Sequence, residues 1–207
     1  MPVWAIVVAG GAGARFGGPK QFLELRGERL VDRAVSSATQ ACDGVVVVLP
    51  RGVPWDGPEV AAVVEGGATR SHSVRAGLSA VPDDADVIVV HDAARPLATA
   101  ALFRTVITAV EAGADAAVPT VALADTVKRV EHGQVIETVA RESLAAAQTP
   151  QAFRAAVLRA AHADAADATD DAALVERAGG RVAAVPGDPR NRKVTDPDDL
   201  TTLESLS

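Results

Sequence analysis

Aromatic residues are scarce in this sequence, at 3% of 207 residues, and tyrosine is absent. Hydrophobic residues nevertheless make up 48% of the chain, so the core must consist of aliphatic strands and alanine-rich helices, which favours α/β layering. The lone cysteine, Cys42, excludes an internal disulfide and is interpreted as a core thiol. No apolar run reaches the roughly 18 residues of a membrane span, and the first one continues into glycines rather than a cleavage site, so we expect a cytoplasmic protein without membrane attachment.

Positive charge is also in deficit, with a formal net charge of -7. This balance argues against a nucleic-acid partner, because binding to a phosphate backbone depends on a basic face. The four histidines lie far apart, with no Cys or His at metal-ligand spacing, so the sequence does not support a zinc site. The length fits a single domain spanning residues 1–207.

Strand-like and helix-like patterns alternate along the chain. We expect strands at residues 4–8, 45–49, 60–64, 87–90, 116–121 and 181–185. We expect helices at residues 30–42, 71–80, 99–112, 150–163 and 170–178. This alternation is typical of βαβ units, so it predicts an α/β fold with a mostly parallel, Rossmann-like sheet and helices on both faces.

One segment interrupts the alternation. Residues 126–131 and 134–139 are two short runs of β-formers joined at His132 and Gly133, which is a hairpin pattern. A lone hairpin is marginally stable in water, so this one should pack on something else, and a second subunit is one candidate. We therefore predict a protruding β-hairpin arm at about residues 124–142.

The run VIVVHDAARP, residues 87–96, combines a buried strand with polar residues. Four branched apolar residues in a row indicate a strand buried on both faces. Asp92 and Arg95 follow it, at the carboxyl edge where open parallel sheets bind ligands. They are therefore placed where a metal-nucleotide or a phosphate would lie. The alternative is an Asp92 that caps the next turn and pairs with Arg95 on the surface.

The first expected strand continues into AGGAGARFGGPK, residues 9–20. Its glycines would let backbone N–H groups approach a polyphosphate, and Arg15 and Lys20 supply positive charge. The loop is neither a Walker loop nor a good dinucleotide fingerprint, because Gly-Lys-Ser/Thr is missing and Phe16 occupies the third glycine position. A flexible connection with two solvated cations is the structural alternative.

Taken together, seven segments resemble the 2-C-methyl-D-erythritol 4-phosphate cytidylyltransferases of the non-mevalonate isoprenoid pathway: AGGAGARFGGPKQF, GGATRSHSVRAGL, VHDAARP, ADTVKR, TPQAF, ATDDAALVE and NRKVTDPDDL. Ribitol 5-phosphate cytidylyltransferases share the HDA-x-RP element, and molybdopterin nucleotidyltransferases share a similar glycine loop. A nucleotide-binding module without transferase chemistry, or an oxidoreductase, is the alternative from a different class.

The resemblance implies that CMP passes from CTP to methylerythritol phosphate, with release of pyrophosphate and without a protein nucleophile. It implies catalytic roles for Arg15, Lys20 and Lys193, which would stabilise charge on the phosphoryl oxygens. The positions that match the family's nucleotide site are Ala9, Gly10, Gly11, Gly67, Ser73 and Asp92. Asp92 would lie near the ribose and Mg²⁺, an ion expected to bind largely through the CTP phosphates.

For the second substrate, the resemblance implies binding by Arg95, Thr126, Arg141, Thr149, Thr169 and Asp170. It also implies a homodimer formed through the arm, with Thr126 and Arg141 completing the partner's site. Without a substrate, Thr169 would be an N-cap, and Arg70 and Arg141 would be surface cations. The spacing from Arg15 to Lys20 is shorter than in many members of the family, and the usual Ala-Ala-Gly turn reads Ala9-Gly10-Gly11.

Overall fold

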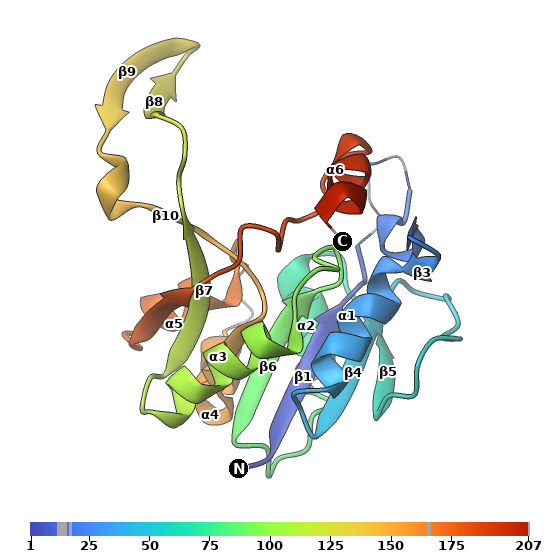
Figure 1. Cartoon of the computed structure of the whole chain (residues 1–207). Helices are drawn as coiled ribbons and strands as arrows, with labels where there is room; N and C mark the ends of the chain where they lie inside the picture. Colours follow the sequence, from blue (N-terminus) through green and yellow to red (C-terminus); the bar gives the residue numbers. More distant parts are fainter. Residues whose placement is uncertain (12–15, 17, 165–166, 207) are drawn as a thin grey trace.

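The computed structural model describes residues 1–11, 16, 18–164 and 167–206, and these residues build a central sheet with helices on both faces (Figure 1). The strands of this sheet are β1 (Val3–Val8), β4 (Gly44–Leu49), β5 (Ala62–Glu65), β6 (Val87–Asp92), β7 (Ala116–Ala122), β10 (Ala145–Ala147), β11 (Gln151–Arg154) and β12 (Val182–Pro186). Their order is β10-β7-β11-β6-β1-β4-β5, and β12 pairs with β7.

Most neighbouring strands run parallel. β1 lies between β4 and β6 in parallel register, β5 extends this part beyond β4, and β12 runs parallel to β7. β11 and β10 are antiparallel insertions. Every residue of β4 and β6 is buried, as expected for valine-rich strands covered on both faces. The predicted α/β fold with a mostly parallel sheet is therefore confirmed.

Helices cover the two faces of the sheet (Figure 1). α1 (Leu30–Thr39) and α3 (Ala100–Glu111) pack on one face, and α2 (Arg70–Leu78), α4 (Ala155–Ala161) and α5 (Asp171–Arg177) on the other. Successive side chains of β1 point to opposite faces of the sheet. Ala5 and Val7 belong to the core on one face, and Ile6 belongs to the core on the other. Within the described part of the chain, no helix has the length and apolar character needed to cross a membrane.

The expected helix at 150–163 is wrong in its first part. Residues 151–154 form β11, which pairs with both β6 and β7, and the helix begins only at Ala155. Ala152 and Phe153 are fully buried on opposite faces of the sheet, so tertiary burial overrides the helical spacing of the alanines.

Short elements near the carboxyl edge were not predicted. They are η1 (Lys20–Phe22), β2 (Glu24–Leu25), β3 (Glu28–Arg29), η2 (Arg141–Ser143), β10 (Ala145–Ala147) and α6 (Asp198–Leu206). α6 packs through Leu203 into a small core with Leu25, Leu30 and Val194. This core anchors the carboxyl-terminal segment close to the amino-terminal half of the chain.

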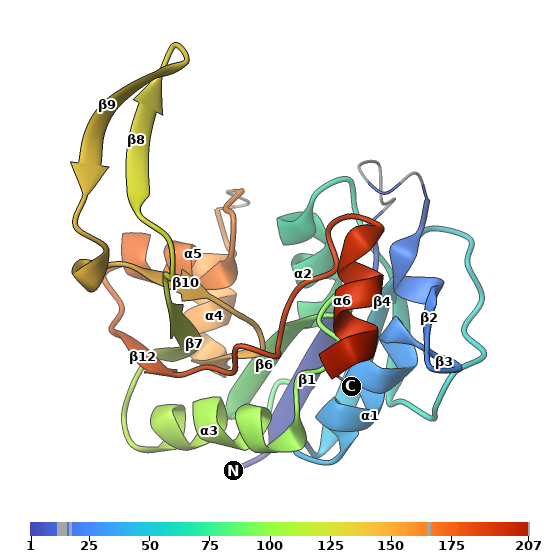
Figure 2. The same ribbon diagram turned by 45° about the horizontal axis from the view of Figure 1, so that its top comes forward.

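The arm, residues 124–142, stands away from the sheet (Figure 2). It consists of β8 (Val127–Glu131) and β9 (Gln134–Val139), which pair antiparallel, so the predicted hairpin is confirmed. His132 and Gly133 form its tip with φ of 50° and 78°, both in the left-handed region that a two-residue hairpin turn requires.

Candidate functional site

Two pockets open side by side at the carboxyl edge of the sheet. The large pocket has a volume of about 540 Å³ and lies beyond the ends of β1 and β6. The small pocket, about 150 Å³, lies beside β11 and the start of α5. Both are lined by Arg70, Asp92 and Lys193, so these three side chains form the junction of the two pockets.

The wall of the large pocket begins where β1 ends. The side-chain amide of buried Gln21 donates to the carbonyl oxygens of Ala9 (2.7 Å) and Gly11 (3.1 Å) and so ties the end of β1 to η1. A Cβ atom at Gly10 would lie 3.1 Å from the Ser73 hydroxyl oxygen, so a larger residue would press on Ser73. Gln21 was not among the predicted site residues, and Arg15 lies outside the described residues.

The opposite wall of the large pocket comes from the start of α2. Gly67 and Ser73 both line it, and the Gly67 N–H donates to the Ser73 hydroxyl at 3.2 Å. Ser73 in turn donates to the Thr69 carbonyl oxygen at 3.1 Å. These bonds fold the segment between β5 and α2 onto the first turn of α2.

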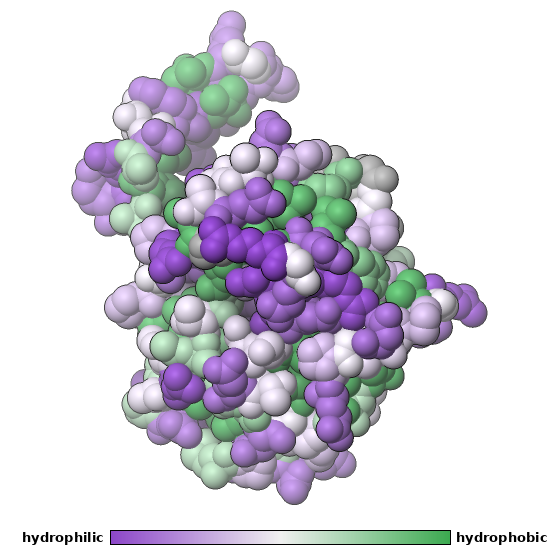
Figure 3. Space-filling view, turned by 45° about the vertical axis from the view of Figure 1, so that its right-hand side comes forward, coloured by the Kyte–Doolittle hydropathy of each residue, from purple (hydrophilic) through white to green (hydrophobic). Residues whose placement is uncertain are grey.

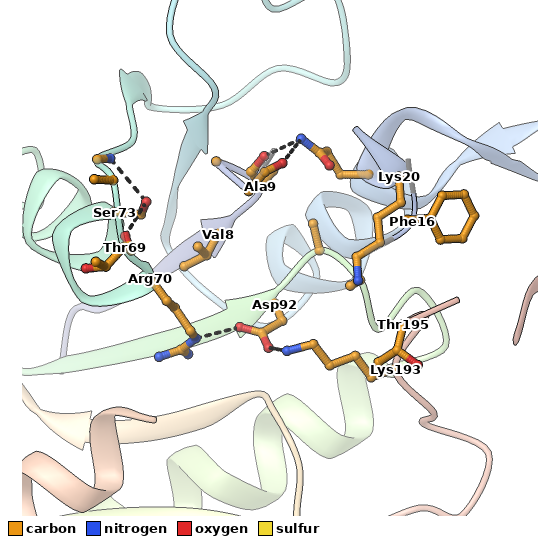
Figure 4. Close-up of a pocket in the computed structure, with 17 residues that line it drawn as sticks. Val8, Ala9, Phe16, Lys20, Thr69, Arg70, Ser73, Asp92, Lys193 and Thr195 are labelled. Atoms are coloured by element: carbon orange, nitrogen blue, oxygen red, sulfur yellow. Dashed lines mark hydrogen bonds and ion pairs between the residues drawn. The ribbon is translucent and has the colours of Figure 1, made fainter. Parts of the chain in front are cut away.

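Asp92 is the centre of the junction, between two cations (Figure 4). Its carboxylate oxygens accept from Lys193 Nζ at 2.6 Å and from Arg70 Nε at 3.0 Å. Burial alone would raise the pKa of Asp92, but the charges of Arg70 and Lys193 hold that pKa far below its ordinary value. Asp92 therefore remains ionised and keeps both cations at the pocket edge. The alternative of a surface pair with Arg95 is wrong.

Arg70 continues this network into the protein. Its guanidinium also donates to Asp171 at 2.7 Å, and Asp171 contacts His162 Nε2 at 2.9 Å. Burial opposes its positive charge, yet the carboxylates of Asp92 and Asp171 raise the pKa of Arg70. With 21% of its side chain exposed, Arg70 is not the surface cation expected from the sequence. The position of Arg70 at a helix start beside the carboxyl edge was the one feature of the sequence that could have indicated a site residue.

The carboxyl-terminal segment places Lys193 beside the glycine loop. Lys20 Nζ donates to the Val194 carbonyl oxygen, and the Val194 N–H donates to the Ala94 carbonyl oxygen at 2.8 Å. Lys20 and Lys193 consequently line the same pocket although they come from opposite ends of the chain. The structure thus brings together two of the three predicted catalytic cations.

Arg95, Thr149, Thr169 and Asp170 line the small pocket. Arg95 is oriented by the carbonyl oxygens of Asn191 (2.8 Å) and Ala147 (3.3 Å), and burial lowers its pKa. Thr149 accepts from the Asp92 N–H at 3.0 Å, which ties this pocket to the junction.

Thr169 does not cap α5, contrary to expectation. The N-cap is Asp170, whose carboxylate accepts from the Ala173 N–H at 3.0 Å. Thr169 is exposed at the pocket rim, one residue before the cap.

Thr126 and Arg141 lie at the base of the arm, and both are exposed. Neither is among the described residues that line the two pockets. The Arg141 guanidinium donates to the Ala124 carbonyl oxygen across the base of the arm. In this single chain, the arm therefore carries two of the predicted substrate-binding residues away from the other four.

The described residues contain no cluster of three His, Cys, Asp or Glu side chains, and Asp92 is the carboxylate that faces the large pocket. Mg²⁺ commonly binds through one or two carboxylates together with substrate phosphates. The arrangement therefore fits an ion that enters with a phosphorylated ligand.

His91, next to Asp92, should make stability pH-dependent. Burial lowers the pKa of His91 to about 4, so the folded protein holds it neutral. The unfolded chain takes up this proton near its ordinary pKa. We therefore expect the free energy of unfolding to fall as pH drops from about 6.5 to about 4, by on the order of 3 kcal/mol.

Denaturant unfolding across this pH range measures the effect. A His91→Gln variant should be less stable at neutral pH but should lack this part of the acid dependence. The same pH slope in both proteins would rule out His91 as its source.

The chain is similar to known proteins along nearly its whole length. Residues 3–206 match the family model "IspD: 2-C-methyl-D-erythritol 4-phosphate cytidylyltransferase". A 2-C-methyl-D-erythritol 4-phosphate cytidylyltransferase of Rhodococcus jostii is 45% identical over 216 residues, covering 99% of this chain and 95% of the relative. A bifunctional enzyme IspD/IspF of Solidesulfovibrio magneticus is 41% identical over 98% of this chain, which spans only 56% of that relative's length.

A solved structure shows the same architecture. The crystal structure of 2-C-methyl-D-erythritol 4-phosphate cytidylyltransferase from Thermus thermophilus superposes with a TM-score of 0.84 at 34% identity. The superposition covers 100% of this chain and 98% of the other.

Proposed function

Since the chain belongs to the 2-C-methyl-D-erythritol 4-phosphate cytidylyltransferase family, we propose that its large pocket binds CTP and its small pocket binds the acceptor. The family reaction transfers CMP from CTP to 2-C-methyl-D-erythritol 4-phosphate, giving 4-diphosphocytidyl-2-C-methyl-D-erythritol and pyrophosphate. The observation that carries this assignment is the junction. Two pockets that meet at Arg70, Asp92 and Lys193 would bring the acceptor phosphate to the α-phosphorus of CTP.

The reaction needs no protein nucleophile. An oxygen of the acceptor phosphate attacks the α-phosphorus, a new P–O bond forms, and the bond to the pyrophosphate leaving group breaks. Negative charge builds up on the phosphoryl oxygens during this step, so catalysis rests on positioning and on cations. Lys20, Lys193 and Arg15 are the proposed cations, with Lys20 and Lys193 on the large pocket.

Asp92 would act through its two cations. It holds Lys193 and Arg70 in place, so the positive charge is preorganised before the nucleotide binds. Arg70 Nη2 is buried and makes no hydrogen bond within the described part of the chain, which leaves a donor for a phosphate oxygen at the junction. We therefore add Arg70 to the proposed phosphate-binding residues.

The rest of the large pocket would hold the nucleoside. Ala9, Gly10 and Gly11 offer backbone along one wall, and Gly67 and Ser73 offer small polar groups on the other. Mg²⁺ would be held by the CTP phosphates together with the carboxylate of Asp92, where it would neutralise phosphate charge.

The small pocket suits a phosphorylated polyol. Arg95 offers a cationic fork for phosphate, and Thr149, Thr169 and Asp170 offer groups that hydrogen-bond hydroxyls. The two remaining predicted residues, Thr126 and Arg141, would have to come from another copy of the chain.

A homodimer formed through the arm would supply them. The arm and the residues after it expose apolar side chains that a single chain leaves uncovered, and Figure 3 shows green, hydrophobic patches on the projecting arm. The exposed fractions are 56% for Val130, 62% for Val135, 56% for Ile136 and 38% for Leu144. Covering such a patch with a second copy removes apolar surface from water, which favours association.

The chain would then act as a single nucleotidyltransferase domain, residues 1–207, with the arm as its dimerisation element. We propose a cytoplasmic location, because the CTP that the reaction consumes is a cytoplasmic metabolite.

Pyrophosphate release tests the proposed substrate pair. With CTP and Mg²⁺, purified protein should release pyrophosphate when 2-C-methyl-D-erythritol 4-phosphate is added, and chelation of Mg²⁺ should stop the release. A matched trial with ribitol 5-phosphate is the control. Release with ribitol 5-phosphate but not with methylerythritol phosphate would overturn the substrate assignment.

A further inference from the structure

Gln151 is a buried polar residue of the small pocket with no role in the chemistry proposed above. It is the first residue of β11, its exposed fraction is 1%, and it lines the small pocket together with Arg95 and Asp170. Its Oε1 atom accepts no hydrogen bond from the described residues. A buried acceptor without a partner is costly, so this atom calls for a partner that the chain itself does not supply.

The contacts of its amide fix which atom is available. Gln151 Nε2 donates to the Gln148 carbonyl oxygen at 3.3 Å and to the Asp170 carboxylate at 3.1 Å. Both partners are pure acceptors, so turning the amide over would set oxygen against oxygen at both positions. Asp170 is itself held by capping α5. The amide is therefore locked with its oxygen directed away from these two acceptors.

The pocket is chemically divided around this atom. Arg70 and Lys193 lie at the junction, and these two cations together with Arg95 suit a phosphate group. An uncharged carbonyl oxygen cannot attract phosphate, but it accepts well from a hydroxyl group. A phosphorylated polyol whose phosphate lies at the junction would direct its hydroxyl-bearing chain toward the other lining residues.

We propose that Gln151 Oε1 accepts a hydrogen bond from a hydroxyl of the polyol acceptor, which makes Gln151 a specificity-determining residue. This inference rests on the proposed placement of the acceptor in the small pocket. A site built around a buried acceptor rejects an analogue that lacks the matching hydroxyl, because the acceptor is then left unpaired.

Gln148 offers a matched control. It has the same side chain, lines the same pocket and is 5% exposed. Its amide is fully used inside the protein, since Nε2 donates to the Asp188 and Asn191 carbonyl oxygens and Oε1 accepts from the Asp188 N–H and from Asn191 Nδ2. Gln148 therefore has a structural role and no acceptor to offer a substrate.

The experiment compares wild type, Gln151→Met and Gln148→Met with methylerythritol phosphate and with analogues that each lack one hydroxyl. Pyrophosphate release at saturating CTP gives kcat/KM for every pair, and thermal melting confirms folding. We expect wild type to lose roughly 10- to 100-fold in kcat/KM with one analogue. For Gln151→Met, kcat/KM with the full substrate should fall by a similar factor relative to wild type. Replacing the full substrate by that analogue should then lower kcat/KM of the variant little further, and its KM for CTP should not change.

Gln148→Met, once folded, should discriminate among the analogues as wild type does. If Gln151→Met fails to fold, Gln151→Leu serves in the same comparison. Undiminished discrimination by the folded Gln151 variant against every analogue would overturn the inference. That outcome differs from failure of the proposed function, in which wild type itself would release no pyrophosphate with methylerythritol phosphate.

Discussion

A Lys20→Ala variant should lose roughly 10²- to 10³-fold in kcat, which is typical when a preorganised charge-stabilising donor is removed. Lys20 lines the large pocket and is held against the carboxyl-terminal segment through the Val194 carbonyl oxygen. Because the charge to be stabilised develops mainly in the transition state, KM for CTP should change much less than kcat. Steady-state pyrophosphate release with CTP as the varied substrate measures both constants.

A control variant and one opposing outcome test the role of Lys20 in the transition state. An Arg51→Ala variant removes a cation whose side chain is 90% exposed and lies outside both pockets, so its activity should remain close to that of wild type. Near-normal kcat with a raised KM in Lys20→Ala would instead mean that Lys20 binds substrate and transition state equally.

Mixing two inactive variants should restore activity if the arm completes the partner's site. Arg141→Ala subunits and Lys20→Ala subunits should each be nearly inactive alone, because every site lacks one cation. In a mixed dimer, one site would combine an intact Lys20 with an intact Arg141 from the other subunit. Random mixing of equal amounts makes half the dimers mixed, each with one intact site, so recovery should approach about a quarter of wild-type activity.

Subunit exchange has to be verified separately, for example by differently tagged subunits that co-purify after mixing. Absence of recovery after proven exchange would place Arg141 in the site of its own chain. A monomer at the assay concentration would also contradict the arm proposal. Arg129→Ala is a control that removes a charge from the outer part of the arm. Its activity alone should stay close to that of wild type, since Arg129 pairs with Glu137 on the same hairpin.

The centre of the fold was predictable because burial on both faces demands an unbroken run of branched apolar residues. β4 and β6 show this, with every residue buried, and the hairpin followed from the turn at His132 and Gly133. β11 was not predictable in the same way. Its four residues carry no local strand pattern, and its conformation depends on pairing with β6 and β7 on either side.

Some site residues were likewise predictable from the sequence and others were not. Residues in sequence motifs at strand ends, such as Asp92 and Lys20, could be placed from the sequence, because parallel strands bring their carboxyl ends to one edge. Arg70 could not be recognised as a buried cation, since the carboxylates that pair with it lie 22 and 101 residues away in sequence. The role inferred for Gln151 depends likewise on which atoms of its amide the neighbours occupy, and sequence spacing does not encode that.

The bond between Lys20 and the Val194 carbonyl oxygen joins residues 174 positions apart, and this separation sets an order of assembly. A chain emerging from a ribosome can pair its valine strands well before residue 193 has been made. It cannot yet hold Lys193 against Asp92, nor dock Leu203 beside Leu25. The central strands β1, β4 and β6 can therefore pair before the site is complete, because the site also needs the segment that carries Lys193.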